Sequence, residues 1–165
     1  MAKDWKESSG LRDYIQLTGS RKAGLEAGGN ACLTVYAGSI PASADDGIGA
    51  ATALVTLTNN GSAPVGSNGL SLEGTLSSGA LVKAYAETWS GTVSNSGAAI
   101  ATFWRWYNYT DAQTGTSTTA LRVQGTVGDA TGAFDMLVDD VVFTDSVVLT
   151  LPSFIYRHPR DRAEL

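Results

Sequence analysis

Histidine and cysteine are nearly absent from this sequence, which contains one of each, His158 and Cys32. A lone cysteine excludes an intrachain disulfide framework. Metal sites built from His and Cys need several such ligands, so the composition argues against them. A Ser-His-Asp hydrolase would have to use His158, and the sequence has no Gly-x-Ser-x-Gly elbow. We therefore predict a protein that is not an enzyme and has no catalytic, cofactor-binding or metal-ligating residues.

Long apolar runs are also missing. No run approaches the roughly 18 residues that a membrane-spanning helix needs. The first residues, Met-Ala-Lys-Asp-Trp-Lys-Glu, lack the apolar stretch of a signal peptide. We expect no membrane partner and synthesis in a reducing cytosol. Cys32 lies in the apolar run 31–36 with no cation beside it, and it is interpreted as a small buried hydrophobic side chain.

Charged residues are scarce, at 16% of the 165 residues against the usual quarter. Thr, Ser and Asn supply the polarity instead, together with 19 glycines. Thr and Val suit a pleated sheet and glycine allows the positive φ of tight turns, whereas the helix formers Glu, Lys and Gln are few. With 43% hydrophobic residues, the chain can build one good core. The composition predicts a single all-β domain.

The charges are unevenly distributed along the chain. Residues 27–156 carry three basic and ten acidic residues, whereas residues 1–26 and 157–165 each carry one more basic than acidic residue. Nucleic-acid binding requires a concentrated basic face, so no nucleic-acid partner is expected. Two interpretations of the basic ends remain open: they contact the acidic body of a neighbouring copy, or they are solvated.

Residues 1–30 and 157–165 differ in character from the part between them. Glycines interrupt residues 1–30, which predicts an extended N-terminal arm with one short helical turn at 11–17. An alternative is an arm folded back on its own domain. In the extended arm, two aromatic side chains are candidate anchors in grooves of a partner. Residues 157–165 form a polar C-terminal tail. The candidate interface residues in these two segments are Trp5, Tyr14, Arg157 and Arg160.

Residues 31–156 show the period-two alternation of β-strands, with turn signals about every ten residues. About eight short strands fit this stretch, and no long helical pattern interrupts them. This spacing predicts an antiparallel β-sandwich of the jelly-roll or Greek-key type.

The strongest predicted strand is 98–109. It places Trp104 and Trp106 on one face and Arg105 and Tyr107 on the other. Large side chains on both faces are typical of a central strand that has one face in the core and the other against a partner. Trp104, Trp106 and Tyr107 are therefore further candidate interface residues. Packing in core and interface is favoured for the aromatic cluster as a whole, and a sugar-stacking platform is the alternative. The cluster consists of Trp89, Phe103, Trp104, Trp106, Tyr107 and Tyr109.

Two clusters of aspartates are the remaining candidates for chemistry. They are Asp45-Asp46-Gly47 and Asp139-Asp140, the second with Asp135 nearby. Calcium binds such hard oxygen ligands, but neither spacing matches an EF-hand loop. Asp before Gly is ordinary turn chemistry, and we favour that interpretation over calcium.

Three stretches carry a resemblance to a known group of proteins. Residues 33–47, Leu-Thr-Val-Tyr-Ala-Gly-Ser-Ile-Pro-Ala-Ser-Ala-Asp-Asp-Gly, are followed by a second strand at 53–57. The later runs 121–128, Leu-Arg-Val-Gln-Gly-Thr-Val-Gly, and 147–154, Val-Val-Leu-Thr-Leu-Pro-Ser-Phe, complete the pattern. Residues 31–155 resemble a group of small tailed-bacteriophage virion proteins.

The resemblance implies a capsid decoration, or cement, protein that binds the outer shell at subunit junctions and stabilises it. Its partners would be the major capsid protein and copies of itself, as a homo-oligomer. It would be made in the host cytoplasm and located in the virion. The alternative is a head-to-tail component, or a tail or fibre component with a receptor- or glycan-binding sandwich.

Overall fold

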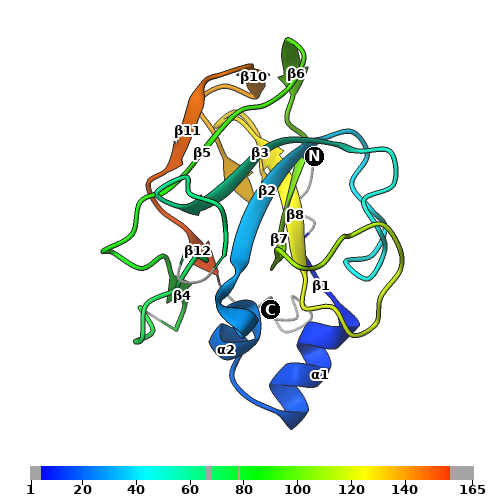
Figure 1. Cartoon of the computed structure of the whole chain (residues 1–165), viewed down its shortest axis with the longest axis vertical. Coiled ribbons are helices and arrows are strands. Elements are labelled where there is room, and N and C mark those ends of the chain that lie inside the picture. Colours follow the sequence, from blue (N-terminus) through cyan, green and yellow to red (C-terminus); the bar gives the residue numbers. More distant parts are fainter. Residues whose placement is uncertain (1–4, 66–67, 78, 157–165) are drawn as a thin grey trace.

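The structure is a computed structural model that describes residues 5–65, 68–77 and 79–156. Within these residues the fold is mostly β, with two short helices and one 3-10 turn (Figure 1). No helix among them is long and apolar enough to cross a membrane. The elements in chain order are β1 (Lys6–Glu7), α1 (Ser9–Leu17), α2 (Arg21–Leu25), η1 (Ala27–Gly29), β2 (Ala31–Ala37), β3 (Thr52–Asn59), β4 (Leu81–Val82), β5 (Trp89–Thr92), β6 (Ala98–Ile100), β7 (Phe103–Asn108), β8 (Val123–Gly128), β9 (Met136–Leu137), β10 (Val142–Thr144), β11 (Val148–Leu151) and β12 (Ile155–Tyr156).

One sheet of eight strands dominates the fold. Its order is β1-β8-β7-β2-β3-β5-β11, and β9 pairs with β8 off this path. All pairs are antiparallel except β8 with β9. Within the sheet, β7 returns by a long connection to lie beside β2, on the far side from β3 and β5. That arrangement is a Greek key. The predicted all-β, sandwich-like fold is confirmed.

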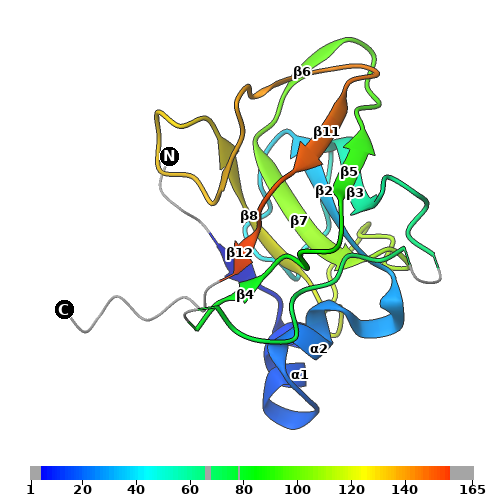
Figure 2. The ribbon, with the colours of Figure 1, turned by 90° about the vertical axis from the view of Figure 1, so that its left-hand side faces the viewer.

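Two small sheets complete the architecture. β6 pairs with β10, and β4 pairs with β12, each as a two-stranded antiparallel sheet. Figure 2 shows β4 and β12 lying below β11, and β6 lying above β11 at the end of the molecule opposite α1 and α2. The chain after β11 therefore crosses the apolar face of the main sheet before it reaches β12.

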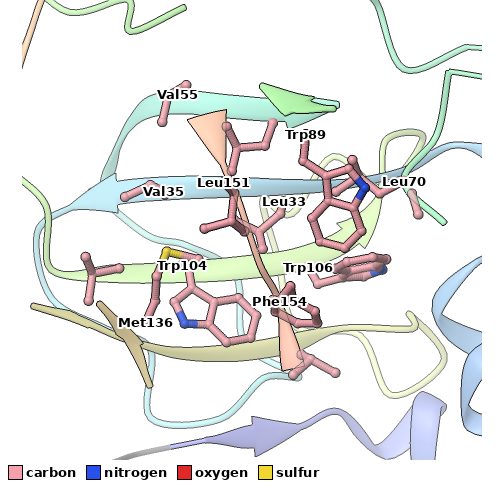
Figure 3. Close-up of a cluster of buried hydrophobic side chains, with 14 of the residues drawn as sticks. Leu33, Val35, Val55, Leu70, Trp89, Trp104, Trp106, Met136, Leu151 and Phe154 are labelled. Atoms are coloured by element: carbon pink, nitrogen blue, oxygen red, sulfur yellow. The ribbon is translucent and has the colours of Figure 1, made fainter. Parts of the chain in front are cut away.

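The hydrophobic core lies on one face of the main sheet (Figure 3). Strand register places Leu33 opposite Trp106 and Val35 opposite Trp104. Phe154, from the segment between β11 and β12, packs on both tryptophans, with ring centroids 5.9 Å from Trp104 and 5.5 Å from Trp106. Fully buried aromatic side chains contribute about 3–5 kcal/mol each relative to alanine, so this cluster is the main apolar support of the fold.

The opposite face of the same strands is buried as well, but it is polar. Two loops, residues 38–51 and 109–122, cover it and are called the covering loops here (Figure 1). Arg105 from β7 donates to the Asp46 carbonyl at 2.9 Å, and Gln124 from β8 donates to the Pro41 carbonyl at 2.7 Å. We predicted that this face lies against a partner. That prediction is wrong, because the chain's own covering loops occupy it.

The predicted extended N-terminal arm is also wrong for residues 5–30. β1 pairs with β8, and Ser8 caps α1 by accepting from the Leu11 amide at 3.2 Å. A Cβ at Gly10 would lie 2.5 Å from the Thr119 carbonyl carbon, so α1 contacts a covering loop directly. The alternative of an arm folded back on its own domain is what the structure shows. Propensity alone could not decide this, because helices this short are stabilised by tertiary packing.

Candidate interaction surface

The strand β11 forms an open edge of the main sheet. It pairs with β5 along Val148–Leu151 and is the last strand in the sheet order. Its outer edge therefore has no strand partner among residues 5–65, 68–77 and 79–156. Edge strands present a row of N–H and C=O groups to solvent, and proteins usually blunt them with charge, proline or short length. β11 reads Val-Leu-Thr-Leu and contains no charged residue.

A hollow of about 420 Å³ adjoins β11 on one side. Its other wall is the segment that leads from β9 to β10. The side chains of Leu137, Val142 and Val147 line the hollow and are exposed. Buried side chains of the core, including Phe143 and Leu151, also line it. The hollow is thus a shallow apolar depression that opens next to an unpaired strand edge.

Exposed apolar side chains gather around this hollow. Ile100 lies directly opposite Val142 in the β6–β10 pair, and Val148 is 62% exposed on β11. Five of the eleven large hydrophobic residues exposed in the described part of the chain belong to this region. We call these five the β11 surface. They are Ile100, Leu137, Val142, Val147 and Val148. Leu137, Val142 and Val147 line the hollow, whereas Val148 follows Val147 in the chain and its side chain lies on the other face of β11. Exposed apolar residues grouped in one region mark an interaction site more often than residues scattered singly.

Local hydrogen bonds hold the β11 surface in shape. Asn95 donates from Nδ2 to the Phe143 carbonyl at 3.0 Å, and its amide donates to Asp145 Oδ1 at 3.2 Å. Ser146 has a φ of 64°, a left-handed conformation in the tight turn between β10 and β11. Asp140 Oδ1 accepts from the Val142 amide at 2.8 Å. These contacts tie the wall of the hollow to the sheet, so the surface is preorganised.

Acidic residues lie next to the β11 surface. Asp139 and Asp140 line the hollow, and Asp145 lies in the adjoining turn. The sequence has no Lys or Arg between Arg122 and Arg157, although this stretch contains five aspartates. A partner with positive charge would therefore meet complementary charges here and no repulsion from lysine or arginine in this stretch.

Three of the predicted interface residues lie inside the domain. Trp104 and Trp106 belong to the apolar core, with 0% and 1% of their surface exposed. Tyr107 is buried on the polar face, where its hydroxyl lies 3.1 Å from Thr34 Oγ1. The prediction that these three form an interface is wrong, because both faces of β7 are covered within the chain. For the same reason they form no sugar-stacking platform in the folded chain.

The other predicted interface residues have different outcomes. Trp5 is half-buried and packs edge-on against Trp104 and Tyr156, with ring centroids 4.8 and 4.7 Å away. It anchors the N-terminal segment to its own domain. Tyr14, on α1, is half-buried and contacts α2 near Gly24. Arg157 and Arg160 lie outside the described residues, so their predicted role stays a prediction.

Two buried arginines support the polar face. Arg122 donates to both carboxylate oxygens of Asp111, at 2.6 and 2.8 Å, and to the Asp45 carbonyl at 2.9 Å. Arg105 donates to the Gln124 side chain, and its pKa falls to about 10, first because burial disfavours its charge and then because Arg122 is near. Burial alone would raise the pKa of Asp111, but the Arg122 hydrogen bonds and charge outweigh it and the pKa lies below the usual range. This network is structural, because it joins the covering loops to the sheet.

The predicted burial of Cys32 is confirmed. Its side chain is fully buried, and burial raises its pKa to about 12. The aspartates 45 and 46 make the contacts of turns and caps: Asp45 accepts from the Ser9 amide and hydroxyl, both at 2.7 Å, and Asp46 from the Ser43 amide at 3.0 Å. Among the described residues, no three His, Cys, Asp or Glu side chains gather as a metal site.

The residues of the β11 surface were missed by sequence reasoning. The available signal was the pairs of adjacent apolar residues, Val141-Val142 and Val147-Val148, because consecutive apolar residues in a strand place one side chain on each face. Comparison with known proteins adds nothing to this picture: no family model, curated protein or solved structure matches the chain.

Proposed function

We propose that the protein is a structural component of a bacteriophage virion, a capsid decoration protein that binds the outer shell and stabilises it. The observation that carries this proposal is the β11 surface, an apolar, preorganised edge of a main sheet whose central strand β7 is buried on both faces by its own chain. The sequence resemblance of residues 31–155 supplies the class of assembly. No chemical step is assigned to any residue.

A surface of this kind suits a component that acts in many copies. Burying roughly 300 Å² of apolar area at about 25 cal/mol per Å² would give about 7.5 kcal/mol, and the cost of association, about 4–15 kcal/mol, offsets most of it. Binding of that strength is modest for one copy. Repeated over the equivalent positions of a symmetric shell, it adds up to a substantial resistance to bursting.

Copy number in purified particles tests the proposal. Quantitative mass spectrometry of virions is expected to find hundreds of copies per particle, as a shell component requires. A count of roughly three to twelve, the size of a symmetric ring, would instead support a head-to-tail, tail or fibre component. Absence from purified virions would refute both versions.

A matched pair of variants connects the copy number to the β11 surface. Val148→Lys places a charge on the exposed edge strand, and Val65→Lys makes the same change at a valine that is 55% exposed elsewhere. Added to particles that lack the protein, the Val148 variant is expected to bind at least tenfold less than the Val65 variant. Equal binding of both would show that the β11 surface does not dock on the shell.

A further inference from the structure

We propose that β11 accepts an added β-strand from a partner protein, and that this strand alternates aliphatic residues with lysine or arginine. The inference rests on the proposed function and names the chemistry of what docks there: an extended basic segment of the shell protein. It follows from three properties of this region, namely the backbone of β11, the apolar hollow beside it and the negative charge of the neighbouring aspartates.

The backbone of β11 provides the template. Because its inner edge pairs with β5 and its outer edge has no strand partner in the described part of the chain, a peptide can extend the main sheet there. Addition of a strand to an open sheet edge is a common mode of peptide recognition, in which main-chain hydrogen bonds supply affinity.

The hollow provides side-chain specificity. Val147, Leu149 and Leu151 alternate along the chain and all line the hollow. In a sheet extended by one strand, every second side chain of the added strand faces the same side as these three residues. The hollow, about 420 Å³ in volume, thus favours aliphatic side chains at alternate positions of the partner.

Charge distinguishes the partner from a second copy of this chain. Asp139 and Asp140 line the hollow and Asp145 adjoins it. Two copies joined edge to edge through β11 would bring these carboxylates together, and like charges facing each other disfavour such pairing. A strand with Lys or Arg between its aliphatic residues meets attraction instead.

The C-terminal residues 157–165 of a neighbouring copy are a weaker match. They supply Arg157, Arg160 and Arg162, but their apolar residues are only Ala163 and Leu165. Pro159 also lacks the N–H that a ladder bond requires. This segment therefore offers the charge without the alternating aliphatic side chains.

Synthetic peptides test the inference on the complete chain. One capped peptide of about seven residues alternates valine with lysine, a second alternates valine with glutamate, and a third is the lysine peptide with a central proline. The lysine peptide is expected to slow hydrogen exchange of backbone amides in β11 and to bind at least tenfold more tightly than the other two. Its binding is expected to weaken as sodium chloride is raised.

A matched pair of charge variants locates the basic partner. Asp139→Asn removes a carboxylate that lines the hollow, whereas Asp129→Asn removes one outside it. The first variant is expected to bind the lysine peptide about three- to tenfold more weakly than the second. Equal loss, or equal binding of the lysine and glutamate peptides, would overturn the proposed chemistry.

Two other outcomes would assign the surface to a different occupant. If the chain alone forms a dimer in analytical ultracentrifugation that Val148→Lys abolishes, the occupant is a second copy. If a peptide with the sequence of residues 157–165 binds more tightly than the lysine peptide, the occupant is the tail of a neighbour. Either result overturns the inference.

The copy number in virions separates this inference from the proposed function. Hundreds of copies per particle with no peptide binding would leave the decoration function standing and refute strand addition. Binding of the lysine peptide by a protein that is absent from virions would refute the decoration function and leave strand addition standing.

Discussion

The two edges of the main sheet are built in opposite ways. At one edge, β8 is paired with β1 at Val123 and Gln124 and with β9 at Val127 and Gly128. Thr126, between these pairs, donates its amide to Asp135 Oδ2 at 2.9 Å. At the other edge, β11 has no strand partner on its outer side among the described residues, and Val147 and Val148 at its start are exposed. The chain thus covers the outer side of β8 with two short strands, whereas no strand covers the outer side of β11 in the described part of the chain.

This contrast indicates which edge of the sheet belongs to the packing of the domain itself and which edge is available for an interaction. The closing strand β1 is two residues long and consists of Lys6 and Glu7, which fits the short, charged strands that block edge pairing. β11 is four residues long and contains no charged residue. Because an open apolar edge invites aggregation, its presence beside a closed one supports a role in docking.

The largest expected effect on stability comes from breaking the buried ion pair that helps to join the covering loops to the main sheet. Asp111→Ala leaves Arg122 buried without its carboxylate, and the free energy of unfolding is expected to fall by about 3 kcal/mol. Asp129→Ala is the matched control: it removes a carboxylate that accepts hydrogen bonds from the amide and hydroxyl of neighbouring Thr131, and it should change the free energy of unfolding by less than about 0.5 kcal/mol. Urea denaturation measures both. A similar loss in the two variants would contradict the role of the buried pair.

Trp5→Ala is expected to have the next largest effect. It removes a half-buried ring that packs on Trp104 and Tyr156, at a cost of about 2 kcal/mol, less than for a fully buried tryptophan. Leu17→Ala, at an exposed position on α1, is the control and should be nearly neutral. Thermal unfolding followed by circular dichroism compares them. An unchanged thermal unfolding midpoint for Trp5→Ala would instead support an extended N-terminal arm that does not pack on the domain.

Acid is expected to weaken the pair of Arg122 and Asp111 before it changes the open edge at β11. Because the folded-state pKa of Asp111 lies below its unfolded value of about 4, the folded chain binds fewer protons than the unfolded chain. The stabilisation is therefore complete above that unfolded value and is lost as pH falls through the folded pKa. Urea midpoints from pH 7 down to pH 2 are expected to fall more steeply for the natural chain than for Asp111→Asn. Parallel curves would contradict this account.

The smallest effect on stability is expected at the open edge. Val148→Thr removes exposed apolar surface that makes no core contact, and the free energy of unfolding is expected to change by less than about 0.5 kcal/mol. Binding of the lysine peptide or of particles should nevertheless weaken. Isothermal titration calorimetry together with urea denaturation separates the two quantities. A loss of stability above about 1 kcal/mol would mean that β11 supports the fold and is not a free surface.

Much of the β domain could be predicted from the alternation of its residues. The strands around Leu33–Val35, Ala53–Leu57 and Trp104–Trp106 lie where the period-two pattern places them. The pattern also separated Trp104 and Trp106 from Arg105 and Tyr107. It could not say what covers the second group, because a partner and a loop of the same chain bury side chains equally well.

The N-terminal segment and the β11 surface escaped prediction for a common reason. The packing of Trp5 depends on Trp104 and Tyr156, which lie about 100 and 150 residues away in sequence. The exposure of Val147 and Val148 depends on β11 being the last strand of the sheet, and strand order leaves no mark in local sequence. Asp139 and Asp140 likewise read as turn residues until the fold placed them at the hollow.

The sequence by itself determined that the chain is all-β, because alternation, threonine and valine, and glycine-rich turns act within a few residues of one another. Only the tertiary structure decided which faces and edges are covered. That choice depends on contacts between distant segments, such as Ser9 with Asp45 and Arg122 with Asp111. The surface left over from those contacts is the one through which we expect the protein to act.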